Sequence, residues 1–111
     1  MILNTLLLGT NRSGYIAGNG DGIVTVAGQP AQRDIWLFNA QTLAVEQIIS
    51  SLKNGHYIFR NLDVAKRYLV MVRDFKPSGS DQRYEPFVWD YVSPSDDLTS
   101  DEQQALWQSW Q

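Results

Sequence analysis

Short apolar runs that alternate with polar positions, separated by turn-forming residues, dominate the chain from Gly22 to Pro94. Alternation with a period of two predicts β-strands that bury one face, and the glycine, proline, asparagine and aspartate residues between the runs predict turns. The predicted strands cover residues 15–17, 23–27, 33–38, 43–50, 56–60, 67–74 and 84–92. The pattern therefore predicts an all-β protein built as a small β-sandwich.

The segments between these runs favour specific turns. Asn39–Thr42 and Gly28–Ala31 each predict a tight turn, the second with a proline that fixes φ at the bend. Asn54 and Gly55 predict a two-residue β-hairpin turn, because this pair readily adopts positive φ. Pro86 predicts that the last strand lies at a sheet edge or contains a bulge, since proline cannot donate a hydrogen bond to the ladder.

Successive residues of a strand point to opposite faces of its sheet, so the alternation assigns each side chain to a face. Ile35 and Leu37 share one face of their strand, and Trp36 and Phe38 share the other. The second face is apolar over several strands, at Trp36, Phe38, Leu69, Met71 and 87–89. A sandwich of this size covers one face of each sheet. We therefore expect either the chain's own termini or other subunits to cover this second face.

The two ends of the chain differ in character from its centre. The chain divides into an apolar N-terminal arm (1–13), a β-sandwich domain (14–95) and a helical tail (96–111). Thr99 and Glu102 have the spacing of a capping box and predict a short helix over 102–110. An isolated helix of this length is marginal in water, so we expect it to dock on its own sandwich or on a neighbouring subunit.

Composition narrows the possible functions. The 111 residues include no cysteine, which excludes disulfides, thiolate metal sites and cysteine nucleophiles. The net charge of −3 and the lack of a basic cluster argue against nucleic-acid binding. No apolar run approaches the roughly 20 residues that cross a membrane. The apolar start has no basic segment or cleavage pattern, so a secretory signal is not expected.

Residues with catalytic or metal-binding chemistry are sparse. His56 is the single histidine, and no serine stands in a nucleophile motif, so we expect no catalytic residue and no enzyme activity. The stretch 19–22 contains too few oxygen ligands for a calcium loop and is better explained as a turn. We expect no metal and no cofactor.

Three motifs resemble those of a known family. Gly28-x-Pro-Ala-x-Arg-x-Ile-x-Leu37, Asn54-Gly-x-Tyr-x-Phe-x-x-Leu62 and Tyr68-x-Val-x-Val-x-Asp74 resemble transthyretin-like domains of the carboxypeptidase regulatory type. The resemblance covers residues 22–75 and implies a Greek-key β-sandwich of about seven strands. The chain lacks the His-rich and Arg-rich site motifs of hormone-binding transthyretin and its hydrolase relatives, so their ligands and chemistry are not implied.

A second resemblance concerns the end of the sandwich and the arm. Residues 84–94, with Asp90-Tyr-Val-x-Pro94, look like the ending of small sandwich proteins of tailed-phage virions. The apolar arm is similar to those that tie virion subunits together. This likeness implies a non-enzymatic structural subunit of the tail, neck or baseplate region. It would be located in the virion, and in the host cytoplasm during assembly. Its partners would be other virion proteins and copies of itself.

Apolar side chains in the arm, on the second sheet face and in the tail are the candidate contact residues. They are Ile2, Leu3, Leu6, Leu7, Leu8, Trp36, Phe38, Trp89, Leu106, Trp107 and Trp110. Tryptophan commonly anchors protein interfaces, but its face also stacks on sugars. The alternative function is therefore a β-sandwich module that binds carbohydrate or a cell surface.

Overall fold

The structure is a computed structural model that describes residues 13–73 and 87–111. This part of the chain forms eight antiparallel strands and one short C-terminal helix. The strands are β1 (Gly14–Gly18), β2 (Thr25–Val26), β3 (Gln29–Pro30), β4 (Asp34–Asn39), β5 (Val45–Ser50), β6 (Tyr57–Leu62), β7 (Tyr68–Val72) and β8 (Phe87–Val92). A short 3-10 helix, η1 (Gly20–Gly22), follows β1, and helix α2 (Ser100–Ser109) ends the chain. The prediction of an all-β, sandwich-like fold with a C-terminal helix is confirmed.

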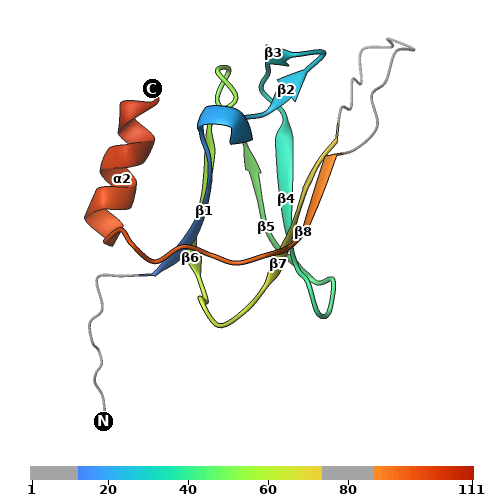
Figure 1. The fold of residues 1–111 in the computed structure, drawn as a ribbon, viewed down its shortest axis with the longest axis vertical. Coiled ribbons are helices and arrows are strands. Elements are labelled where there is room, and N and C mark those ends of the chain that lie inside the picture. Colours follow the sequence, from blue (N-terminus) through green and yellow to red (C-terminus); the bar gives the residue numbers. More distant parts are fainter. Residues whose placement is uncertain (1–12, 74–86) are drawn as a thin grey trace.

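The strands form three sheets. The largest has the order β5-β4-β7-β8, and β1 pairs with β6 in a second sheet. Strands β2 and β3 form a small hairpin of their own. In Figure 1 the β1-β6 pair lies between helix α2 on one side and the four-stranded sheet on the other. The chain thus has two facing sheets, with the helix as an outer layer on the smaller one.

The core lies between these two sheets. Ile35, Leu37 and Phe59 are completely buried, and Val70 is nearly so. Ile35 and Leu37 face Phe59 because alternate residues of β4 and β6 point into the space between the sheets. The predicted alternation is confirmed here: the intervening Trp36 and its even-numbered neighbours lie on the opposite face.

After β8 the chain leaves the four-stranded sheet and crosses to β1. The backbone amides and carbonyls of Tyr15 and Ser95 exchange two hydrogen bonds of 2.9 Å. The Tyr15 hydroxyl also donates to Asp97 Oδ1 at 2.6 Å. Burial, together with this hydrogen bond and the negative charge of Asp97, raises the pKa of Tyr15 to about 12. This crossing holds one edge of the sandwich together and places the helix beside β6 (Figure 1).

Helix α2 begins with the predicted capping box. The Thr99 side chain accepts from the Glu102 amide at 3.1 Å, and the Glu102 carboxylate accepts from the Thr99 amide at 2.8 Å. The helix starts at Ser100, slightly earlier than predicted. Arg60 of β6 donates to Gln104 Oε1 at 2.8 Å and to the Ser100 carbonyl at 3.0 Å. The helix therefore docks on its own sandwich.

Two local features differ from the prediction. The turn at Asn54 and Gly55 forms, with Gly55 at φ 86°, but it closes no hairpin, because β5 and β6 belong to different sheets. The strand predicted over 23–27 is shorter, and β2 turns back into β3 through Ala27 and Gly28. Both of these turn residues have positive φ, at 52° and 81°. The second strand of this hairpin, β3, therefore lies within the segment 28–31 that was predicted as a turn.

Candidate interaction surface

The face of the four-stranded sheet that points away from the core carries an apolar side chain on each of its strands. We call this surface the outer face. Its apolar residues are Trp36, Phe38, Val45, Ile48, Leu69, Met71 and Val88, which share one side because residues paired across antiparallel strands point the same way. One row runs from Ile48 through Trp36 and Met71 to Val88. The row crosses the full width of the sheet.

Toward its two edges the outer face is exposed to solvent, whereas its central residues, such as Trp36 and Met71, are half-buried. Ile48 is 51% exposed, Val45 49% and Val88 48%. The rings of Trp36 and Phe38 stack with their centroids 6.1 Å apart. Helix α2 packs against β6 in the other sheet and does not reach this face. An apolar surface that crosses the whole width of a sheet is a candidate interaction site.

The structure brings only part of the predicted contact residues together. Trp36 and Phe38 lie on the outer face, whereas Trp89 pairs with Val70 and packs against the core from the inner side. The arm residues Ile2, Leu3, Leu6, Leu7 and Leu8 lie outside the described residues. The outer face also contains Val45 and Ile48, which the sequence pattern did not single out, and Val88, which lies within the predicted apolar stretch 87–89. Their signal was present in the period-two pattern, but strand register was needed to join them.

The predicted contact residues of the helix lie on the far side of the sandwich. Leu106, Trp107 and Trp110 are each half-buried. Trp107 lines a cavity of about 290 Å³ between the helix and the strands, together with Ile58. Trp110 packs against His56, with ring centroids 5.0 Å apart. The four tryptophans therefore do not form one shared platform.

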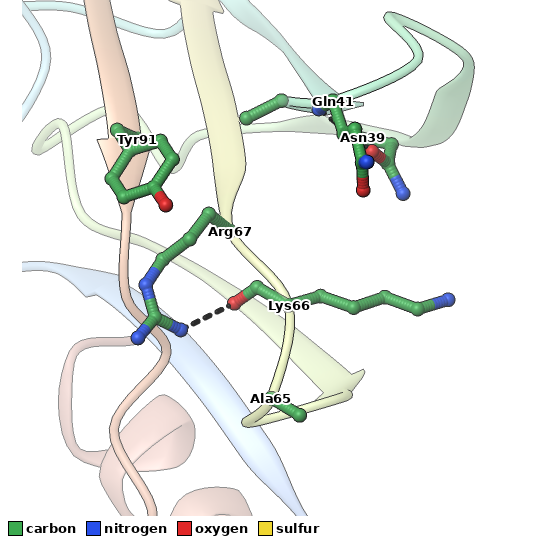
Figure 2. Close-up of a pocket in the computed structure, with 7 residues that line it drawn as sticks. Asn39, Gln41, Ala65, Lys66, Arg67 and Tyr91 are labelled. Atoms are coloured by element: carbon green, nitrogen blue, oxygen red, sulfur yellow. Dashed lines mark hydrogen bonds between the residues drawn. The ribbon is translucent and has the colours of Figure 1, made fainter.

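A polar pocket opens at one end of the four-stranded sheet. It has a volume of about 420 Å³ and is lined by Asn39, Ala40, Gln41, Ala65, Lys66, Arg67 and Tyr91. These residues come from the β4-β5 turn, the β6-β7 turn and an irregularity in β8. Figure 2 shows Arg67 extending to the side where Tyr91 lies, and Lys66 extending the other way. The pocket was not predicted, because its residues meet only after the strands are in place.

The described residues show little of the chemistry of metal or catalytic sites. Among residues 13–73 and 87–111, no group of acidic residues and histidine comes together to hold a metal ion. The His56 ring lies 3.0 Å from Asn54 Oδ1 and beside Trp110, which gives it a packing role. In the same part of the chain, no helix has the length and apolarity to cross a membrane.

Comparison with known proteins finds no match to this chain. No family model matches the chain, and neither a curated protein nor a solved structure matches it. The outer face and the polar pocket therefore have to be interpreted from their own residues.

Proposed function

We propose that this chain is a non-enzymatic structural subunit that assembles through protein–protein contacts on the outer face. The observation that carries the proposal is the continuous apolar row across the outer face, with Ile48 and Val88 at its ends about half exposed. Apolar surface removed from water contributes about 25 cal/mol per Å², so a partner that covers the row gains free energy. Charged side chains, which would oppose such a contact, are absent from the row itself.

We further propose that the assembly is a tailed-phage virion, in its tail, neck or baseplate region. This step is supported by the likeness of residues 84–94 to the endings of small virion sandwich proteins and by the apolar arm. The partners are then other virion proteins and copies of this chain. A rigid sandwich whose exposed sheet contacts a neighbour suits a role in which shape and packing, rather than chemistry, are needed.

The native mass of the purified full-length chain over a wide concentration range tests the proposal. We expect the mass to increase with concentration until a closed oligomer forms. Ile48→Lys and Val88→Lys each place a charge in the apolar row and should keep the chain monomeric. Both positions are about half exposed, so we expect the folded state to lose no more than about 0.5 kcal/mol.

Val64→Lys is the matched control for this experiment. Val64 is 45% exposed and lies in the β6-β7 turn, off the outer face. We expect this variant to assemble like the unmodified chain. A strict monomer at every concentration would contradict self-assembly, and equal loss of assembly in Val64→Lys and Ile48→Lys would contradict the choice of surface.

A carbohydrate- or cell-surface-binding module remains the second candidate. The observation in its favour is the stacked pair of Trp36 and Phe38 on an open sheet, since aromatic faces pack against sugar rings. Titration with a broad glycan panel should then shift the fluorescence of the chain, and Trp36→Ala should abolish the shift. A flat titration would count against this function.

A further inference from the structure

The polar pocket contains two adjacent cations that have no acidic partner among its lining residues. No aspartate or glutamate lines it, although the whole chain is acidic with a net charge of −3. Lys66 makes no side-chain hydrogen bond or ion pair with the described residues. A pocket lining with positive charge and no acidic residue, in a protein of negative net charge, favours an anionic ligand.

Arg67 is held in place but retains free donors. Its Nη1 atom donates to the carbonyls of Val64 and Lys66, at 3.3 and 2.9 Å. Within the described chain, its Nη2 and Nε atoms have no hydrogen-bond partner. Because the guanidinium is already oriented, a carboxylate that binds the remaining donors loses little free energy to ordering this side chain.

The amide of Asn39 is oriented in the same way. Its Oδ1 atom accepts from the backbone amides of Gln41 and Thr42, at 2.9 and 3.1 Å. Asn39 lines the pocket, and these two bonds leave its Nδ2 group as a further donor. The lining thus offers fixed donors of two kinds, charged and amide, which suit a ligand rich in hydroxyl and carboxylate oxygens.

Tyr91 supplies an aromatic face at an unusual backbone conformation. It is 71% exposed and has φ 59°, a region that non-glycine residues rarely adopt. Asp90 Oδ1 accepts from the Tyr91 amide at 2.7 Å and holds the bulge. The Arg67 guanidinium lies 5.9 Å from the ring centroid (Figure 2). A strained residue that displays a large ring to solvent is typical of a binding site.

We propose that this pocket binds an acidic sugar, with the sugar ring on Tyr91 and its carboxylate on the remaining donors of Arg67. The volume of about 420 Å³ lies in the range of small-ligand sites, about 300–1,000 Å³. An extended acidic peptide fits less well, because the bulge at Asp90 and Tyr91 interrupts the β8 edge where a peptide strand would pair. The pocket is separate from the outer face, so this proposal does not depend on the proposed function.

Titration of the full-length chain with trigalacturonate, followed by backbone NMR, tests the proposal. We expect shifts concentrated in the turns 39–42 and 65–67 and at Tyr91. Arg67→Ala and Tyr91→Asn should each weaken binding about tenfold or more, the loss of one charged or stacking contact. Asparagine tolerates positive φ, so the second variant removes the ring without adding backbone strain. Lys53→Ala, an exposed cation in the turn after β5, is the control and should bind normally.

Two further probes separate the contribution of the carboxylate charge from that of the sugar ring. Fully methyl-esterified trigalacturonate keeps the sugar and loses the charge, whereas triglutamate keeps the charge and lacks the sugar. We expect both to bind at least about tenfold more weakly than trigalacturonate. No shift with trigalacturonate overturns the proposal. Binding of the ester as tight as that of trigalacturonate would also overturn it. So would equally tight binding of triglutamate, if Tyr91→Asn leaves that binding unchanged.

Discussion

Gly55 shows at the scale of one residue how a turn is fixed by a distant part of the chain. Its φ is 86°, and a Cβ at this position would lie 2.5 Å from the Val24 carbonyl oxygen. The Val24 amide donates to the Gly55 carbonyl at 2.9 Å, so the two backbones cannot separate without losing this bond. Glycine is therefore required here both by conformation and by space.

We predict that Gly55→Ala lowers the free energy of unfolding by about 2–4 kcal/mol, from left-handed strain and the backbone clash together. Gly28→Ala is the matched control, because Gly28 also has positive φ, at 81°, but has open space around its Cβ position. It should cost only about 1–2 kcal/mol, the conformational term. Urea denaturation measures both values. Equal losses in the two variants would show that the contact with Val24 has no energetic role.

Residue-scale prediction succeeds where the information is local. The alternation of Ile35 and Leu37 with Trp36 and Phe38 requires only the period of a strand, and the structure confirms it. The turn at Asn54 and Gly55 was also predictable, since the pair itself favours positive φ. The close approach of Val24 to Gly55 could not be predicted, because it depends on where β2 lies relative to the end of β5.

At the scale of elements, Gln103 anchors helix α2 to the sandwich. This side chain is completely buried, and its Nε2 atom donates to the Ser13 carbonyl at 2.9 Å and to the Leu98 carbonyl at 3.2 Å. The first of these bonds joins the helix to the residue just before β1. A buried amide that satisfies two backbone carbonyls is difficult to replace with an apolar residue.

We predict that Gln103→Ala lowers the free energy of unfolding by about 1–3 kcal/mol, because it leaves two carbonyls without donors and a small void. Gln108→Ala is the control: Gln108 lies in the same helix, is exposed and makes no side-chain hydrogen bond within the described chain. That variant should change stability by less than about 0.5 kcal/mol. Thermal unfolding monitored by circular dichroism compares them. Similar effects would mean that Gln103 does not anchor the helix.

The beginning of helix α2 could be predicted from sequence, and its docking site could not. The capping box depends on Thr99 and Glu102, three positions apart. The contact that receives the helix involves Arg60, which lies 40 positions before Ser100. The same reason explains the wrong hairpin prediction: a turn residue fixes the local bend, but whether the next strand pairs in the same sheet depends on the whole set of strands.

At the scale of the molecule, the candidate sites differ in how far the sequence reveals them. Most of the outer face follows from the alternation on the predicted strands, at Trp36, Phe38, Leu69, Met71 and Val88, and the structure extends it by register to Val45 and Ile48. The polar pocket gives no sequence pattern, since its residues come from separate turns and a bulge. Surfaces carried by one strand can thus be predicted, whereas sites assembled from several loops require the fold.

The arm provides a test of whether the sandwich and its assembly are separable. The buried core described here draws on residues from Tyr15 to Val72, all within the sandwich. We predict that deleting residues 1–10 leaves the urea unfolding transition unchanged and lowers the native mass at high concentration. The arm is apolar, so its removal takes away contact area available to neighbouring subunits but no residue of this core.

Replacing Leu6, Leu7 and Leu8 together by serine is the matched variant, because it keeps the chain length and removes only apolar surface. We expect it to reproduce the effect of the deletion on mass, which would assign assembly to those side chains rather than to the length of the arm. If instead either variant fails to fold, the arm belongs to the core of the sandwich. The apolar outer face would then have to be explained as a surface that the chain covers itself, and its role in assembly would be lost.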